Sequence, residues 1–237
     1  MTPIVAHTST AFDQDLRQLR ELIAVMGSRA EEAIHEAMRC LTERDVDGAA
    51  KLVAADQEID RLEAEAEDRV VQLIALRAPM ADDLRDALAA LKIAGVVERI
   101  ADYAKNIARR VKRLPKKGSI EPLSLLPQMA NMAAAMVHDV LDAFVERDAQ
   151  KAKKVCQSDD ALDAFYESIF RALLTFMMEN TQNIGPSTSL LFVAKNLERI
   201  GDHVTNIAEN AYYVVTGEQL PVARPKYDET TAVLAGA

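Results

Sequence analysis

The sequence has few of the residues that make turns, disulfide frameworks and aromatic cores. Its 237 residues include only eight glycines, eight prolines, two cysteines and no tryptophan. So few chain breakers leave long stretches uninterrupted, which disfavours a fold of many short strands and turns. Cys40 and Cys156 fit neither a disulfide framework nor the close spacing of a zinc motif, so we expect both to be reduced thiols in the core.

Two further absences concern membranes and nucleic acids. No stretch approaches the roughly 18 uninterrupted apolar residues of a membrane span, and the N-terminus lacks the basic start and apolar run of a signal peptide. We therefore expect a cytoplasmic protein without direct membrane insertion. The net charge of −9 argues against nucleic-acid binding, because lysine and arginine supply most non-specific affinity for phosphates. The same sign disfavours adhesion to an anionic bilayer.

The residues that are abundant favour helices. Apolar residues make up 49% of the chain, and alanine, leucine, glutamate, aspartate and arginine are common, so an all-α fold is expected. Stop signals such as Pro79, and Asp45 as a helix N-cap, divide the chain into helical segments. Six such segments are predicted, at about residues 10–43, 46–76, 80–114, 123–146, 149–179 and 187–217.

The two halves of the chain are repeats. Residues 98–108, ERIADYAKNIA, reappear at 198–208 as ERIGDHVTNIA, and residues 43–45 reappear at 146–148. Two matching runs of three helices predict two tandem, similar three-helix bundles. We place the first bundle at residues 1–114, a linker at 115–122, the second bundle at 123–217 and a flexible tail at 218–237.

Oxygen-bearing side chains recur at helical spacing in both halves. Glu98, Asp102 and Asn106 fall on one stripe of a helix because residues four apart differ by about 40° around the axis. If the second and third helices of each half are antiparallel neighbours, such stripes converge along a groove. The equivalent groups are Asp56, Asp60, Glu98, Asp102 and Asn106 in the first half and Asp159, Asp163, Glu198, Asp202 and Asn206 in the second.

Two interpretations of these stripes remain open. A bound cation or a cationic partner would compensate the repeated like charge, and oxygen ligands suit ions such as Mg²⁺, Mn²⁺ or iron. Alternatively, the stripes are solvated faces that Arg99, Lys105 and Arg109 neutralise. His35 and His138 hold equivalent places on the first helix of each half, either as ligands or as structural residues inside the bundle or at its boundary.

Signals for catalysis are weak, and we expect no enzyme. The sequence contains no glycine-rich phosphate loop and no nucleophile elbow. Glu32 and His35 have the Glu-x-x-His spacing of ferritin-like carboxylate proteins, which makes a helical di-metal redox or storage protein one alternative. The equivalent of Glu32 is Ala135, so the second copy is missing. A metal-free helical scaffold is the other alternative.

The doubled motif, preceded in the first half by PMADDLRDALAALKIAGVVER, resembles the PhoU family from about Phe12 to Gly217. The resemblance implies six helices in two similar bundles and a negative regulator of the phosphate-starvation (Pho) response and of Pst phosphate uptake. It further implies protein partners: the ATPase subunit of the Pst transporter and a PhoR-like, phosphate-sensing histidine kinase, which would recruit the protein to the inner membrane face. Whether the chain is a monomer or a homodimer is left open.

The resemblance also implies a cofactor, because some family members bind multinuclear metal clusters on their acidic stripes. The metal would be iron, zinc or a hard divalent ion such as Mg²⁺ or Mn²⁺. Carried over residue by residue, one cluster would use Asp56, Asp60, Glu98, Asp102 and Asn106, and the other Asp159, Asp163, Glu198, Asp202 and Asn206. The family pattern at Asp82–Arg85 occurs in the first half only, so a role of Arg85 would belong to that half.

Overall fold

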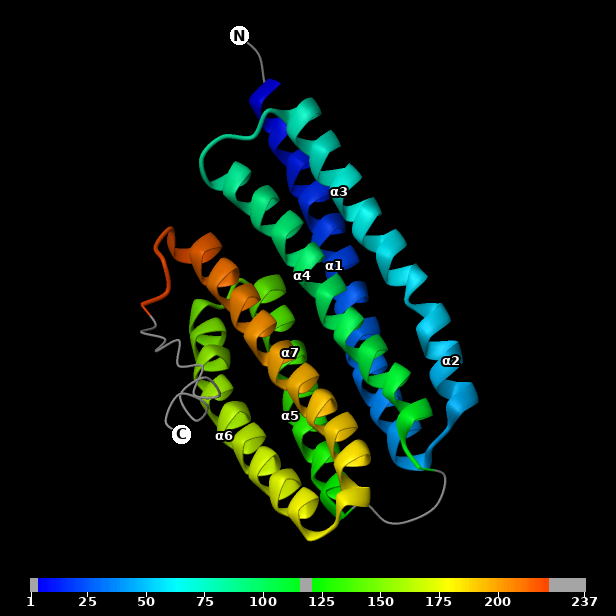
Figure 1. Cartoon of the computed structure of the whole chain (residues 1–237). Helices are drawn as coiled ribbons and strands as arrows, with labels where there is room; N and C mark the ends of the chain where they lie inside the picture. Colours follow the sequence, from blue (N-terminus) through cyan, green and yellow to red (C-terminus); the bar gives the residue numbers. More distant parts are fainter. Residues whose placement is uncertain (1–3, 116–120, 222–237) are drawn as a thin grey trace.

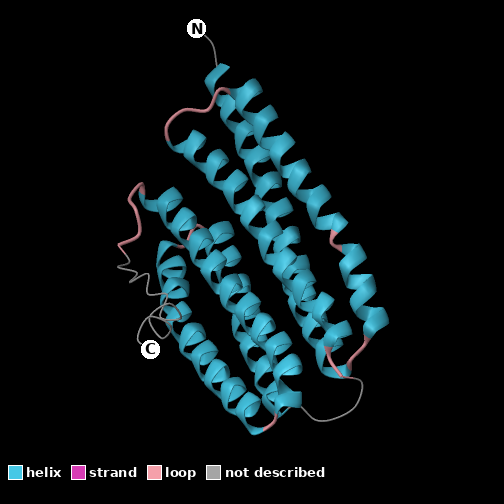
Figure 2. Cartoon of the chain, viewed as in Figure 1, coloured by secondary structure: helices cyan, strands magenta, loops and turns pink. Residues whose placement is uncertain are grey.

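The structure, a computed structural model, describes residues 4–115 and 121–221, and within these ranges it consists of helices and short connections without strands (Figure 2). The α-helices are α1 (Ile4–Glu43), α2 (Val46–Ala55), α3 (Gln57–Arg77), α4 (Asp82–Arg110), α5 (Leu126–Glu146), α6 (Ala149–Glu179) and α7 (Ile184–Thr216). Three short 3₁₀ turns are η1 (Val111–Arg113), η2 (Glu121–Leu125) and η3 (Thr181–Asn183).

The helices form two bundles that pack against each other. In the first bundle α1, α3 and α4 contact one another, with α2 against α1 and α4, and in the second α5, α6 and α7 do the same. The bundles meet where α4 packs on α7 and α1 packs on α5 (Figure 1). One hydrophobic core runs through both bundles. The predicted all-α fold of two similar three-helix bundles is therefore confirmed.

Local sequence explains how the first helix of each bundle connects to the second. Asp45 caps α2 by accepting a hydrogen bond from the Gly48 amide, and Asp148 caps α6 in the same way from Gln150 and Lys151. The residues before these caps, Arg44 and Arg147, both have a φ of 57°, which turns the chain sharply out of the preceding helix. The repeated Glu-Arg-Asp sequence thus forms the same turn between the first and second helices of each bundle.

The prediction of one continuous helix at 46–76 is wrong, because the helix is broken at Asp56 into α2 and α3. The equivalent α6 is continuous. Asp56 turns its buried carboxylate toward α4, where it forms an ion pair with Lys105. Position 205, which corresponds to Lys105, carries a threonine, so the second repeat has no lysine at this point.

Other helix boundaries differ less from the prediction. α7 begins at Ile184, so Pro186 lies in its first turn, where a helix needs no amide donor. α4 ends at Arg110 and continues as η1. Residues 116–120 of the predicted linker and 222–237 of the predicted tail lie outside the described residues.

The described part of the chain has no helix long and apolar enough to cross a membrane. Both cysteines are buried, as expected, and neither forms a disulfide within the described part of the chain. Burial raises the pKa of the Cys40 thiol to about 11, so the reactive thiolate is disfavoured at neutral pH. Cys40 therefore acts as a small core side chain.

Candidate functional site

The first acidic stripe is bridged by a lysine of the same bundle. Lys105 on α4 forms ion pairs with Asp56, at the break between α2 and α3, and with Asp102 on its own helix. Only 8% of the Asp56 side chain is exposed, and a buried carboxylate without an ion-pair partner is destabilising. The Lys105 ammonium thus joins the two helices that carry the stripe.

The remainder of the first stripe carries excess negative charge. Burial raises the pKa of Glu98, and the carboxylates of Asp102, Asp60 and Glu63 raise it further, while Arg99 acts in the opposite direction. Asp60 and Glu63 lie on α3 and Glu98 lies on α4. The acidic faces of these two neighbouring helices therefore converge, as expected from the sequence.

The last member of the first stripe is bonded to an arginine of its own helix. Asn106 accepts a hydrogen bond from Arg109 through its side-chain oxygen, at 3.2 Å. That amide oxygen is therefore already occupied by a cationic donor. Four carboxylates form the converging part of this stripe, and Glu63, which sequence reasoning did not include, is one of them.

The second stripe has a similar shape with a different counter-ion. Burial raises the pKa of Glu198, and Asp202 and Asp163 add to the increase. Lys195 Nζ lies 2.7 Å from Glu198 Oε1, and this ammonium group offsets part of the increase in the pKa of Glu198. The other oxygen, Oε2, is buried and accepts no hydrogen bond from any described residue.

Asp159 reaches the second stripe because Gly201 leaves room for it. A Cβ atom at position 201 would lie 2.6 Å from Asp159 Oδ1 and 2.5 Å from Leu162 Cδ2. The buried carboxylate of Asp159 therefore packs directly against the backbone of α7. Asn206 lies further along the same helix, half-buried, and its carbonyl oxygen accepts a hydrogen bond from the Asn210 side chain at 2.7 Å.

The two stripe lysines do not occupy equivalent positions. Lys105 corresponds to Thr205, and Lys195 corresponds to Gly95. Each repeat therefore supplies a lysine from a different end of its stripe. The sequence indicates Lys105 as a neutralising charge. It gives no such signal for Lys195, whose counterpart in the first repeat is a glycine.

The donor atoms are suited to a hard or borderline cation, but their arrangement is not that of a ready-made site. Within residues 4–115 and 121–221 no three histidine, cysteine, aspartate or glutamate side chains gather around one point as metal ligands would. In the first stripe the Lys105 ammonium contacts Asp56 and Asp102 itself. A metal ion would fit these residues only after the lysine had moved away.

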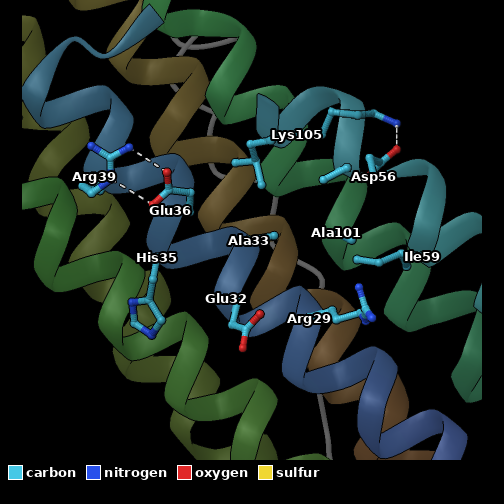
Figure 3. A pocket seen from close by; sticks show the side chains of 12 residues that line it. Arg29, Glu32, Ala33, His35, Glu36, Arg39, Asp56, Ile59, Ala101 and Lys105 are labelled. Atoms are coloured by element: carbon cyan, nitrogen blue, oxygen red, sulfur yellow. Dashed lines mark hydrogen bonds and ion pairs between the residues drawn. The ribbon is translucent and has the colours of Figure 1, made fainter. Parts of the chain in front are cut away.

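A groove of about 620 Å³ adjoins the first stripe. It lies between α1 on one side and α2, α3 and α4 on the other, and its charged pairs line opposite walls (Figure 3). Arg39 on the α1 wall is held by Glu36, at 2.7 Å, and by Asp45, at 2.7 Å. The lining residues are Arg29, Glu32, Ala33, His35, Glu36, Arg39, Leu52, Ala55, Asp56, Ile59, Ala101 and Lys105.

The two histidines singled out by the sequence are exposed side chains. His35 lies on the rim of this groove with Glu32, and both are exposed. His138 is 60% exposed, with Nδ1 3.4 Å from Glu31 Oε2 across the contact between α5 and α1. The histidines are therefore not core residues of the bundles.

The comparison of the repeats explains why the groove exists. Arg29 and Ala33 of α1 correspond to Met132 and Met136 of α5, and the Met136 side chain is buried. Ala33 is much shorter than its buried counterpart Met136, so α1 supplies less side-chain volume at this point than α5 does. Glu32 is likewise matched by Ala135, so the charged rim belongs to the first repeat alone.

Comparisons with known proteins agree with this repeated architecture. A family model described as the PhoU domain matches residues 23–111 and again residues 126–211. The phosphate-specific transport system accessory protein PhoU homolog of Zymomonas mobilis is 50% identical over 217 residues, covering 92% of each chain. The homolog of the same description from Rhizobium meliloti is 41% identical over 229 residues, covering 96% of this chain and 97% of the relative.

Two crystal structures have similar folds. PhoU from Pseudomonas aeruginosa aligns with a TM-score of 0.83 at 33% identity and covers 87% of this chain and 100% of the solved one. The phosphate transport system regulatory protein PhoU from Streptococcus pneumoniae aligns with a TM-score of 0.83 at 27% identity, covering 89% and 100%. The similarity therefore extends over both bundles.

Proposed function

Since the chain belongs to the PhoU family, we propose that it is an accessory protein of phosphate-specific transport that represses the phosphate-starvation response and limits phosphate uptake. The observation that carries this proposal is the match of both repeats to the PhoU domain, together with similarity to PhoU accessory proteins over nearly the whole chain. The protein acts by binding other proteins and has no turnover of its own.

The partners that fit this role are the ATPase subunit of the phosphate transporter and a phosphate-sensing histidine kinase. The relatives' description as accessory proteins of a transport system supports association with the transporter. The protein is cytoplasmic and reaches the inner face of the membrane through these partners. If the protein is a homodimer, each of its two copies would present the same partner-binding surfaces.

The regulatory role is tested by deleting the gene in its host and measuring a phosphate-regulated promoter in phosphate-rich medium. Loss of the protein should raise transcription several-fold and increase phosphate uptake, and a plasmid copy should reverse both. Normal repression and normal uptake in the deletion strain would refute the proposal.

We further propose that the acidic stripes are the metal-binding faces, with iron, zinc, Mg²⁺ or Mn²⁺ as candidate ions. The first set is Asp56, Asp60, Glu98, Asp102 and Asn106, and the second is Asp159, Asp163, Glu198, Asp202 and Asn206. Burial and neighbouring carboxylates raise the pKa of Glu98 and of Glu198, and this supports the proposal, because a bound cation would stabilise both carboxylates in their charged form. Bound metal would neutralise and order the faces that meet partners.

Elemental analysis of tag-free protein, purified without chelator or added metal, tests the metal proposal. The comparison is the variant with Glu98, Asp102, Glu198 and Asp202 all changed to alanine. Stoichiometric metal that disappears in the variant would support the proposal. Equal metal content in both proteins would place the metal elsewhere.

A metal-free scaffold with solvated acidic stripes is the second candidate, favoured by the two lysines that already pair with stripe carboxylates. In that case Asp102→Ala and Asp202→Ala would leave partner binding unchanged. The di-metal redox or storage alternative would instead require iron-dependent oxygen consumption by the purified protein.

A further inference from the structure

The surface where α4 and α7 run side by side is here called the seam (Figure 1). Three contacts between these helices mark it along its length. The Arg85 guanidinium lies 5.1 Å from the centre of the Tyr213 ring at one end, and Arg110 lies 4.3 Å from that of Phe192 at the other. Between them, Tyr103 Oη lies 3.2 Å from His203 Nε2.

The seam collects positive charge in a protein whose net charge is −9. Arg99 and Arg199 hold equivalent positions in the two repeats, and both lie close enough to His203 to lower its pKa. Both are exposed, and neither forms a hydrogen bond or ion pair within the described ranges. Two seam cations at the centre of the molecule are therefore available to another molecule.

The ends of the seam combine further cations with apolar surface. Lys92 is exposed and lines a groove of about 400 Å³ together with Arg85, Leu88 and Tyr213. Leu88 is 43% exposed, Tyr213 42% and Phe192 49%. A charged surface with large apolar side chains at both ends has the composition of a protein-binding site.

The two acidic stripes border the seam on either side. Glu98 and Asp102 lie on α4 toward α3, and Glu198 and Asp202 lie on α7 toward α6, as their charged neighbours on those helices show. Asp202 is close enough to His203 to act against the two arginines there. A flat anionic bilayer would therefore meet the stripes as well as the seam, whereas a narrow segment could lie between them.

We propose that the seam binds an acidic segment of a partner protein, with its carboxylates on Arg99 and Arg199 and its apolar side chains on Phe192 and Tyr213. The seam from residue 85 to residue 110 spans 25 positions of α4, or about 38 Å at 1.5 Å per residue. An extended segment of about 12 residues covers this length at about 3.3 Å per residue. The inference rests on the proposed function, since it names the surface through which a regulatory partner binds.

The test uses a fluorescein-labelled peptide of alternating glutamate and leucine, 12 residues long, and measures its binding to the full chain by fluorescence anisotropy at low and moderate salt. Each exposed carboxylate–arginine pair contributes up to about fivefold in affinity, so the double variant Arg99→Ala, Arg199→Ala should bind about tenfold more weakly. The matched control is Arg61→Ala, Arg171→Ala, which removes the same charge from exposed positions on α3 and α6. The control should stay within about twofold of the wild type, because it changes only distant, screened charges.

Three results would overturn the inference. One is absence of peptide binding at low salt, and another is equal weakening by the seam and control variants. The third is binding to phosphatidylglycerol vesicles that depends on the seam arginines while the peptide does not bind. Failure here is separable from failure of the proposed function, since a deletion strain can lack repression while the purified chain shows no seam-dependent binding.

Discussion

Tyr103 Oη lies 3.2 Å from His203 Nε2, although the two residues hold the same position in two repeats and are separated by 100 residues. Their rings are 5.4 Å apart between centroids. A residue that contacts its own counterpart lies near the axis that relates the repeats, so the bundles are arranged about an approximate twofold through this pair. The contact is part of the interface that holds the two bundles together.

The first prediction concerns the pH dependence of stability. Burial lowers the pKa of His203, Arg99 and Arg199 lower it further, and Asp202 acts in the opposite direction. Below the usual histidine pKa of about 6.5 the unfolded chain binds a proton that the folded chain does not. Stability should therefore fall as the pH drops through that value toward the lower folded pKa, and this loss should cease below it.

Thermal unfolding between pH 8 and pH 5 measures the effect. The variant His203→Tyr, which copies the residue of the first repeat, should lose part of the decline in Tm. Exposed His138 offers the control, since His138→Gln should keep the wild-type slope. An unchanged slope in His203→Tyr would contradict the assignment.

The second prediction concerns the lysine of the first acidic stripe. Lys105→Thr copies Thr205 of the other repeat and leaves the buried carboxylate of Asp56 without its partner. Loss of one member of a buried ion pair should lower the free energy of unfolding by about 3 kcal/mol. Urea denaturation measures the change.

The double variant Lys105→Thr, Asp56→Asn separates this cause from lost packing. Removing the unpaired charge should restore at least about half of the stability lost by Lys105→Thr. If the double variant is as unstable as the sum of the single ones, the two side chains do not interact and the prediction fails.

The third prediction concerns the two ion pairs of Asp86, one within the first bundle and one between the bundles. Asp86 of α4 is buried and accepts hydrogen bonds through Oδ2 from Arg20 of α1, at 3.1 Å, and from Arg147 after α5, at 2.5 Å. Asp86→Asn would leave two arginines at the interface without an anionic partner. We expect a loss of about 3 kcal/mol in the free energy of unfolding.

Asp15→Asn is the control for this change. Asp15 accepts from Arg77 at 3.0 Å, but 40% of its side chain is exposed, so its loss should cost less than about 1 kcal/mol. If Asp86→Asn and Asp15→Asn lower the free energy of unfolding equally, the buried ion pairs of Asp86 stabilise the fold no more than an exposed pair does.

Periodicity and repetition predicted the fold because both can be recognised in the sequence without knowing which residues are in contact. Ile93, Val97, Ile100 and Ala104 recur at helical spacing on one side of α4, and all four are buried. The capping role of Asp45 followed from its position alone. The converging stripes followed from the antiparallel order of neighbouring helices.

The contacts that sequence reasoning missed join residues without any spacing relationship. Asp56 pairs with Lys105, 49 residues away, and Asp86 of α4 pairs with Arg20 of α1 and with Arg147 after α5. Comparison of the repeats could have found the Tyr103–His203 pair, because twofold packing brings equivalent positions together. It could not have found Lys195, which has no counterpart.

The fourth prediction concerns the groove beside the first stripe and uses one repeat as the control for the other. Met136 is buried, and its counterpart Ala33 lines the groove. Met136→Ala should leave a cavity in the second bundle and cost about 2–4 kcal/mol. Ala33→Met adds the same atoms where space already exists, so it should cost less than about 1.5 kcal/mol.

Urea denaturation of the two variants and of the combined variant measures these changes in the free energy of unfolding. The sites lie in different bundles, so we expect the two changes to add within about 0.5 kcal/mol. If Ala33→Met destabilises the chain as much as Met136→Ala, the groove does not admit a methionine side chain. The difference between the repeats at these two positions would then have a cause other than the space left by Ala33.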